Sequence, residues 1–395
     1  MDKLAIEGGT PVREKTLSYG AQWINETDEK AVIEVLRSDW LTTGPKVEEF
    51  ENKFAARVDA ECCVAINSGT AALHVAAFAA GIKEGDEVIT TPMTFVASAN
   101  SILYQKARPV FADVEKDTLN INVKNVEAAI TSRTKAIIAV DYTGQPVDMD
   151  ELKNIAVRHH LTLIEDAAHS LGATYKGRPV GSMADLTTFS MHPVKHITTG
   201  EGGMVSTDSS ELAQKMRWFR NHGITTDAHQ RADKGGWFYE MVALGHNYRL
   251  SDINCALGIS QLNKLDNWVA RRKEIAARYH SAFSNMPAIT TLSERSDRES
   301  SWHLYIILLN LDMLRVGRAE IFAALRAENI GVNVHYMPVY WHPYYKNLGY
   351  KRGLCPIAED AYERMLTLPL FPKMSDKDAN DVIEAVRKVV TFYLK

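Results

Sequence analysis

The sequence predicts an α/β protein with a mostly parallel sheet flanked by helices, followed by a smaller α+β domain. Apolar runs of strand length alternate with stretches at helical spacing between residues 62 and 208, which is the order of βαβ units. A long helical stretch over 251–283 then leads into a second set of strands and helices. The 395 residues, 46% of them hydrophobic, allow two domains with a large core. We expect an N-terminal arm over 1–26, a large domain over 27–260 and a small domain over 261–395.

The elements are predicted in this order. The arm lacks periodicity, whereas residues 28–37 and 47–58 carry apolar side chains at helical spacing and are expected to be helices. The rest of the large domain is predicted to contain strands over 62–66, 87–91, 109–112, 135–141, 161–165, 184–190 and 203–208, an alanine-rich helix ending at Gly81, and helices over 94–105, 126–131, 148–159 and 211–220. The small domain is predicted to contain strands over 302–309 and 332–336 and helices over 319–328 and 376–393.

One polar segment, residues 223–239, has no strong period. It contains a mixture of charges, namely Asp227, His229, Arg231, Asp233 and Lys234. We expect a mobile loop at the site or at an interface.

Composition excludes several classes of function. The net charge is −4 and basic residues form no stripe, so a nucleic-acid partner is not expected. No run approaches the roughly 18 apolar residues of a membrane span, and the N-terminus lacks a signal-peptide core, so we expect a cytoplasmic protein with no membrane partner. The cysteines form no CxxC pair, which argues against a zinc site or a disulfide framework, and no metal is expected. They are Cys62, Cys63, Cys255 and Cys355.

Lys195 lies in a turn between two apolar runs, ADLTTFS (184–190) and GMVSTD (203–208), each expected to be a buried strand. Its neighbours are a proline, threonines and glycines rather than the charged residues of a solvated helix face. Such a turn lets the backbone approach a ligand closely. A partly desolvated lysine loses its proton near neutrality and attacks carbonyl groups. The alternative is an ordinary lysine in a solvated loop, and only other residues can separate the two.

A second candidate site is the turn at 67–71, Asn-Ser-Gly-Thr-Ala, where a strand passes into a helix. Free backbone N–H groups at a helix N-terminus, together with hydroxyl groups, can hold a phosphate. Plain N-capping by Ser68 or Thr70 explains the same residues equally well.

Three further residues follow predicted strands at the edge where parallel sheets bind ligands. Asp166 comes directly after the apolar strand over 161–165, and a carboxylate there could keep a pyridine nitrogen protonated. The alternative is a capping aspartate, but with a suitable lysine downstream we favour the functional interpretation. His169 could support Asp166, although a single histidine is often a core residue. Phe95 could offer its face to a ring, although aromatic residues are common in cores.

Five segments resemble, in order, the motifs of a known family: NSGTAA (67–72), TPMTFVASAN (91–100), EDAAHSLGA (165–173), TFSMHPVKHITTGEGG (188–203) and GHNYRLSDINCALG (245–258). The chain is similar to the nucleotide-sugar aminotransferases of fold type I, the DegT/DnrJ/EryC1/StrS family, from about residue 12 onward. This resemblance implies an aspartate aminotransferase-like fold and pyridoxal 5′-phosphate as cofactor. HPVKHITTGEGG (192–203) and VHYMPVY (334–340) look most like members that aminate C4 of a UDP-linked 4-keto-6-deoxy-N-acetylhexosamine towards pseudaminic acid.

The resemblance also implies residue roles. Lys195 would bind the cofactor covalently and carry protons, while Asp166 would pair with the pyridine nitrogen beside His169. These three would be the catalytic residues. The remaining cofactor contacts would be Gly69, Thr70, Phe95, Ser190 and Asn247, the last supplied by a partner subunit in a homodimer with shared sites. The implied substrate contacts are Tyr19, Asp39, Trp40, Leu41, Thr42, Ser190, Arg249, His335, Tyr336 and Tyr340.

The expected reaction is amino transfer from L-glutamate to the keto sugar. The same fold also serves aminotransferases for other 3- or 4-keto nucleotide sugars, linked to dTDP or GDP. It serves sugar 3-dehydratases as well, but these relatives replace the lysine by histidine, and Lys195 argues against that reaction. A non-catalytic regulator could retain the fold too, since a fold does not determine function.

Overall fold

A seven-stranded sheet organises the larger part of the molecule in the computed structural model, which describes residues 3–226 and 236–395. In spatial order its strands are β1 (Cys62–Ile66), β9 (Gly203–Thr207), β8 (Leu186–Ser190), β5 (Thr162–Asp166), β4 (Thr134–Val140), β2 (Glu87–Thr90) and β3 (Arg108–Phe111). β9 runs antiparallel to both its neighbours, and all other pairs are parallel. The predicted mostly parallel sheet is therefore confirmed.

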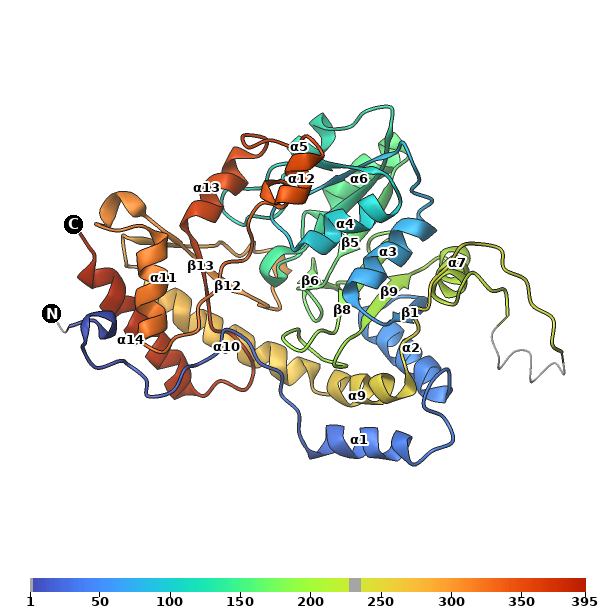
Figure 1. The fold of residues 1–395 in the computed structure, drawn as a ribbon, viewed down its shortest axis with the longest axis horizontal. Coiled ribbons are helices and arrows are strands. Elements are labelled where there is room, and N and C mark those ends of the chain that lie inside the picture. Colours follow the sequence, from blue (N-terminus) through green and yellow to red (C-terminus); the bar gives the residue numbers. More distant parts are fainter. Residues whose placement is uncertain (1–2, 227–235) are drawn as a thin grey trace.

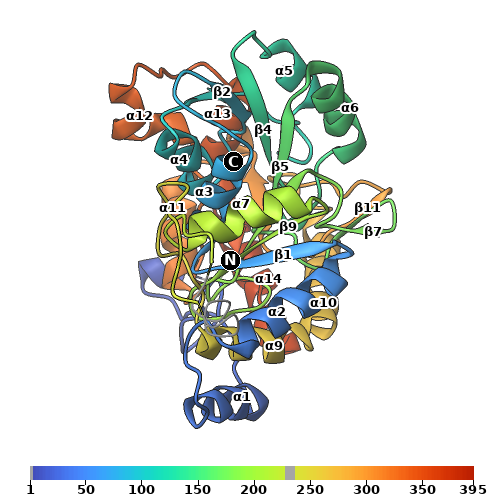
Figure 2. The same cartoon turned by 90° about the vertical axis from the view of Figure 1, so that its right-hand side faces the viewer.

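Helices cover both faces of this sheet (Figure 2). Successive residues of β4 show why: Ala136 and Ile138 belong to one buried cluster, and Ile137 and Ala139 to another. A strand buried on both faces needs an uninterrupted apolar run. One face packs against α2 (Pro45–Val58), α5 (Val123–Ala128), α6 (Met149–His159) and α9 (Asp252–Leu262), and the other against α3 (Gly69–Ala79), α4 (Val96–Tyr104) and α7 (Ser210–Arg220).

The helical stretch predicted over 251–283 is confirmed, and it consists of two helices, α9 and α10 (Leu265–Phe283). The break falls at Asn263 and Lys264, where the Lys264 ammonium donates to Asn25 and Asp28 at 2.8 and 2.6 Å. Both acceptors lie at the start of α1 (Glu26–Leu36). The break therefore coincides with a tertiary contact that periodicity cannot reveal. The proposed domain boundary at residue 260 falls within α9.

The smaller part lies at the left of Figure 1, with both chain ends. Its antiparallel sheet contains β10 (Ile289–Thr291), β12 (Tyr305–Leu309) and β13 (Met365–Leu368), covered by α11 (Arg318–Ala327) and α14 (Asp376–Phe392). The strand predicted over 332–336 was wrong. These residues form a single bridge, Asn333 with Thr367, because the segment bends towards the large sheet and the His335 carbonyl accepts from the Tyr142 hydroxyl. β10 and β13 were missed.

The remaining elements are short. They are η1 (Ala5–Glu7), η2 (Tyr142–Gly144), β6 (Thr174–Tyr175), β7 (Arg178–Pro179), β11 (Arg298–Glu299), η3 (Leu311–Met313), η4 (Val339–Trp341), α12 (Pro343–Asn347) and α13 (Pro356–Arg364). β11 pairs with β6 across the two parts. Of the polar segment 223–239, residues 227–235 lie outside the described residues, including the five charged side chains named above. Within the described ranges, no helix is long and apolar enough to cross a membrane.

Candidate active site

A cavity of about 470 Å³ lies at the carboxyl ends of the central strands. Register explains its position: Gly203 of β9 is paired with Ile66 on one side and with Ser190 on the other, so the turn after β1 meets the end of β8. Asp166 ends β5 one strand further along. The volume suits a small-molecule site. Ten of the predicted residues line this cavity, namely Tyr19, Gly69, Thr70, Phe95, Asp166, His169, Ser190, Lys195, His335 and Tyr336.

Lys195 reaches into this cavity from the turn between β8 and β9. Its backbone N–H donates to the His192 carbonyl at 2.9 Å, and its ammonium nitrogen lies 3.5 Å from Nε2 of His303. Burial lowers the pKa of Lys195 to about 8; the charge of Asp166 opposes this shift and that of Arg272 adds to it. At a pKa of about 8, roughly a tenth of this amine is unprotonated at pH 7, and that form is the one nucleophilic attack on a carbonyl requires.

Asp166 is buried at the end of β5 and carries two hydrogen bonds. The Ser98 hydroxyl donates to Oδ2 at 2.6 Å and the Ala168 backbone N–H donates to Oδ1 at 3.2 Å. Burial raises the pKa of Asp166, while these two bonds and the charge of Lys195 act in the opposite direction. The carboxylate retains acceptor capacity for a cationic N–H in the cavity. Sequence reasoning missed Ser98, although its place in TFVASAN (91–100), at the start of α4, was a usable signal.

The opposite end of the cavity is the N-terminus of α3. Ser68 caps this helix, since its Oγ accepts from the Ala71 N–H at 3.1 Å, so the capping interpretation holds for Ser68. Gly69 must lack a side chain, because a Cβ there would lie 2.7 Å from the Cβ of Ser190 and 2.8 Å from its Oγ. Backbone N–H groups at this helix end, together with the hydroxyls of Thr70 and Ser190, form a donor set that suits a phosphate.

Aromatic and histidine rings form the remaining wall. Phe95 is 57% exposed and its ring centre lies 6.1 Å from that of Tyr336. The Tyr336 hydroxyl is 3.2 Å from Nε2 of His169. Tyr19 lies beside His335, with ring centres 5.2 Å apart. His303 also lines the cavity and was not predicted, because it belongs to no motif that sequence reasoning recognised.

The other predicted residues lie outside this cavity. Tyr340 is fully buried; its hydroxyl donates to Glu359 at 2.5 Å and accepts from the Cys355 N–H, so it lies in the core and does not line the cavity. Arg249 lines a separate cleft with Arg217 and Arg220. Exposed Asn247 pairs through its backbone with Asn221 in the same region. Asp39, Trp40, Leu41 and Thr42 are exposed next to this cleft, where Thr42 pairs with Ser251.

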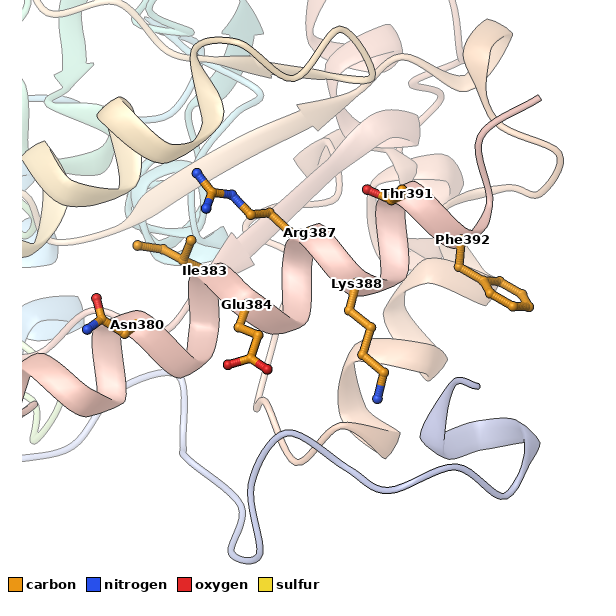
Figure 3. Close-up of a pocket in the computed structure, with 7 residues that line it drawn as sticks. All are labelled: Asn380, Ile383, Glu384, Arg387, Lys388, Thr391 and Phe392. Atoms are coloured by element: carbon orange, nitrogen blue, oxygen red, sulfur yellow. The ribbon is translucent and has the colours of Figure 1, made fainter. Parts of the chain in front are cut away.

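A larger hollow on the outer face of α14 contains none of the predicted residues (Figure 3). All its lining residues come from that one helix. Figure 3 shows the side chains of Arg387 and Lys388 pointing in different directions, and Lys388 is already paired with Glu328 at 2.8 Å. The convergent polar groups of a small-molecule site are therefore found at Lys195 and not here.

Comparison with known proteins decides the family. The sequence profile of the DegT/DnrJ/EryC1/StrS aminotransferase family matches residues 22–387. The chain belongs to this family. Within the DegT/DnrJ/EryC1/StrS aminotransferases, it is 46% identical over 381 residues to the spore coat polysaccharide biosynthesis protein SpsC of Bacillus subtilis, covering 96% of this chain and 98% of SpsC.

Solved structures of relatives support the same family assignment. Helicobacter pylori PseC, an aminotransferase involved in the biosynthesis of pseudoaminic acid, superposes with a TM-score of 0.89 at 33% identity over 96% of this chain and 100% of PseC. The sugar aminotransferase Spr1654 of Streptococcus pneumoniae, in its PLP form, gives 0.90 at 34% identity over 96% and 100%. The fold is therefore fold type I, and the protein is a pyridoxal phosphate-dependent sugar aminotransferase.

The residues of the cavity fit this cofactor. An amine of lowered pKa, a carboxylate with spare acceptor capacity and a helix N-terminus with hydroxyl groups match its aldehyde, ring nitrogen and phosphate. Bound there, pyridoxal phosphate supplies an electron sink for the negative charge that develops when a proton leaves the donor carbon.

Proposed function

We propose that this enzyme transfers an amino group from L-glutamate to the C4 keto group of a UDP-linked 4-keto-6-deoxy-N-acetylhexosamine. The main support is that one cavity brings Lys195 and Asp166 together with His335 and Tyr336, which belong to the segment most similar to enzymes of that type. Likeness to PseC over the whole chain supports the same substrate class.

In this proposal each residue has a defined task. Lys195 holds the cofactor, and its amine, when free, takes a proton from the carbon of the donor and returns it during the exchange. Asp166 keeps the ring nitrogen protonated, with His169 beside it. Phe95 covers the ring, and Gly69, Thr70 and Ser190 receive the phosphate. Tyr19, His335 and Tyr336 orient the sugar at the mouth of the cavity.

We further propose that the site is completed by a second copy of the chain. Asn247 and Arg249 belong to the phosphate and substrate sites by resemblance, yet they lie outside the cavity of their own chain. The neighbouring segment exposes large apolar side chains as a contact surface would: Trp237 is 84% and Leu244 82% exposed. An active homodimer explains both observations.

Hybrid dimers test this sharing. Lys195→Ala and Arg249→Ala are each expected to be nearly inactive, but dimers containing one of each keep one intact site. Randomly reassembled mixtures should therefore recover about a quarter of wild-type activity. A mixture with no more activity than its components would contradict the shared site, as would a fully active monomer in size-exclusion chromatography.

A second candidate substrate is favoured by the 46% identity to SpsC, a protein of spore coat polysaccharide biosynthesis. It is another 3- or 4-keto nucleotide sugar, linked to UDP, dTDP or GDP. A panel of keto sugars with glutamate, analysed by mass spectrometry and NMR of the amine formed, separates the candidates. Activity confined to dTDP-linked sugars would overturn our first choice, and replacement of glutamate by other amino acids tests the donor.

The role of Lys195 has its own test. Borohydride treatment of the holoenzyme should fix the cofactor on the peptide containing Lys195, as read by peptide mass spectrometry. Lys195→Ala should lack the modification. Fixation on a different lysine would contradict the proposal.

A further inference from the structure

His303 is the side chain nearest to the reactive amine that no motif accounts for. Its Nε2 lies 3.5 Å from Nζ of Lys195, and it is 5% exposed, in the same cavity. Its ring centre lies 4.4 Å from that of His169 and 5.6 Å from that of His196. It comes from the smaller part of the molecule, just before β12, whereas Lys195 comes from the large sheet.

The backbone at His303 is held from behind by Arg272 of α10. One guanidinium nitrogen, Nη1, donates to the carbonyls of Trp302 and His303 at 3.2 Å each and to that of Leu370 at 2.8 Å. Trp302 itself has a positive φ of 51°. A buried cation bound to three carbonyls restricts the position of this turn, and with it the direction of the histidine ring.

The same turn is attached to the large sheet. The Ser301 N–H donates to the Gly144 carbonyl and its hydroxyl to the His169 carbonyl, both at 3.0 Å. Gly144 has a φ of 107°, and a Cβ there would lie 2.9 Å from the backbone nitrogen of His303. The glycine is therefore needed for the close approach that brings His303 to Lys195.

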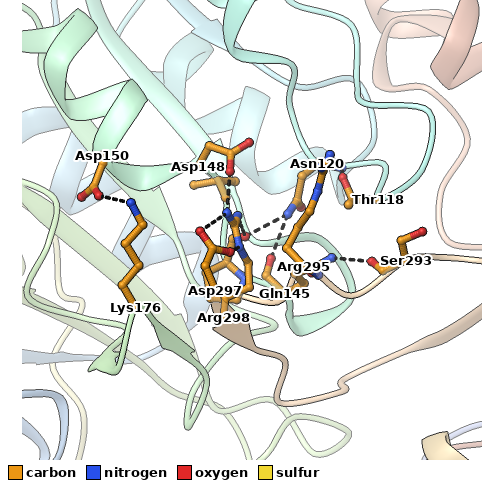
Figure 4. A network of polar contacts seen from close by, with 12 residues as sticks. Thr118, Asn120, Gln145, Asp148, Asp150, Lys176, Ser293, Arg295, Asp297 and Arg298 are labelled. Carbon is orange, nitrogen blue, oxygen red and sulfur yellow. Dashed lines mark hydrogen bonds and ion pairs between the residues drawn. The ribbon is translucent and has the colours of Figure 1, made fainter.

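A network of polar contacts extends this attachment (Figure 4). Arg298 bonds to Asp148 at 2.5 Å and to the Pro146 carbonyl at 2.8 Å. Gln145 accepts from the Arg295 N–H at 2.7 Å and donates to the Ser293 carbonyl at 3.0 Å. Residues 293–304 are thus fastened along the loop that follows β4, and His303 cannot move independently of the site.

The surroundings of His303 keep its ring neutral. Burial is the main cause that lowers its pKa far below the ordinary value, and Lys195, His169, His196 and Arg272 act in the same direction. A neutral imidazole has one nitrogen that accepts and one that carries hydrogen. Nε2 faces the Lys195 amine, and Nδ1 has no hydrogen-bond partner among residues 3–226 and 236–395. A protonated Lys195 amine can only donate, so Nε2 is the acceptor towards the ammonium form, and His303 is too weak a base to take its proton.

We propose that His303 is a positioning residue: its Nε2 accepts a hydrogen bond from the amine of Lys195 and holds that amine in the cavity while it is not joined to the cofactor. This rests on the proposed role of Lys195. A lysine side chain has a flexible four-carbon stem, and a fixed acceptor limits the orientations of its amine when proton transfer is due. The acceptor also stabilises the ammonium form against the burial of the site.

Three variants of His303 separate hydrogen bonding from packing. Gln places an amide near the position of Nε2, Asn places it near Nδ1, and Phe fills the space without an acceptor. For each holoenzyme we would measure the single-turnover rate with glutamate and the KM for glutamate. For each cofactor-free full chain we would measure the pH midpoint of Lys195 labelling by an amine reagent, read by peptide mass spectrometry.

His303→Phe should lower the single-turnover rate about 10- to 100-fold with KM changed less than about twofold, because orientation and not donor binding is lost. Its labelling midpoint should fall by about one pH unit, because the ammonium loses an acceptor. His303→Asn should behave in the same way, and His303→Gln should regain the midpoint and most of the rate. The contrast between Gln and Asn does not depend on the folding of the Phe variant.

The proposal would be overturned if His303→Gln and His303→Asn behaved alike, whether both were active or both were slow. It would also be overturned if the pH midpoint of Lys195 labelling were unchanged in His303→Phe and His303→Asn. All variants should still fix the cofactor on Lys195 with borohydride. Failure of that fixation in the wild type would instead refute the proposed role of Lys195.

Discussion

Two buried polar clusters lie close together in this molecule and differ in how far their groups are paired. Arg298, in the network of Figure 4, donates to Asp148, to both oxygens of Asp297 and to the Pro146 carbonyl. Around Lys195, by contrast, several buried atoms find no partner within the described ranges, namely His169 Nδ1, His303 Nδ1, and Nε and Nη2 of Arg272.

This difference in pairing distinguishes polar groups that stabilise the fold from polar groups that bind a ligand or react. Leaving a buried polar group unpaired costs free energy, so a natural sequence tolerates it where a ligand or a reaction needs the group. The Arg298 cluster joins two parts of the chain, whereas the Lys195 cluster is poised to bind and react. Substitutions in the first should affect stability, and substitutions in the second should affect chemistry.

The sharpest test of this contrast is Lys195→Arg. The charge is kept, but a guanidinium stays protonated and can neither attack an aldehyde nor shuttle a proton. Turnover should fall by more than the about 10²- to 10⁴-fold that proton transfer alone contributes. Steady-state assays with thermal unfolding as a control check this. Residual turnover within tenfold of wild type would show that Lys195 is not the reacting amine.

Asp166→Asn should cost about 10²- to 10³-fold in kcat, as expected for removing one preorganised charge. The amide can still accept from Ser98, so the fold should be retained. The second readout is the absorbance spectrum of the bound cofactor. The way this spectrum varies with pH should differ from the wild type, because the charge facing the ring nitrogen is lost. An unchanged spectrum and rate would exclude this contact.

Arg298→Met should show the reverse pattern. It leaves Asp148 without its donor and removes one of two donors to the Pro146 carbonyl, which still accepts from Asn120 at 3.2 Å. Breaking the Arg298–Asp148 pair should cost about 3 kcal/mol in the free energy of unfolding, since Asp148 keeps some access to water. Below the unfolding transition, kcat should change only about twofold, because Arg272 and Ser301 still hold the turn at His303. Denaturant titration measures the loss, and Lys176→Met, which breaks the exposed pair with Asp150, is the matched control with little expected effect.

The smallest effect concerns the pH dependence of stability. The pKa of Lys195 is about 8 in the folded enzyme, lower than in the unfolded chain. Between these values the unfolded chain binds more protons, so raising the pH from 8 to 10 should stabilise the folded form. The free energy of unfolding of the cofactor-free wild type, relative to Lys195→Met, should therefore rise over this window. If the free energy of unfolding of the wild type, relative to Lys195→Met, fell over this window instead, the folded enzyme would hold the charged amine in a favourable environment.

The same contrast explains what the sequence could predict. Asp166 and Lys195 follow apolar strands at the edge where a parallel sheet delivers its ligand residues, so local pattern could place both at one edge, although it left a capping aspartate and a solvated lysine open. His303 reaches the site only through the contacts of Arg272 and Gly144, which depend on the tertiary path of the chain. The burial of Tyr340 was not foreseen for a related reason: its partner, Glu359, lies in a helix that sequence reasoning did not predict.

The long helix α10 has a consequence of a different kind. Its first turns, with Leu265 and Trp268, pack into the core of the large sheet, and its last turns, with Tyr279 and Phe283, pack into the core of the smaller part. The two cores share one uninterrupted rod, with Arg272 near its centre. Amide hydrogens in the middle of that rod should exchange with solvent only when the whole protein opens, so the two parts should melt as one cooperative unit.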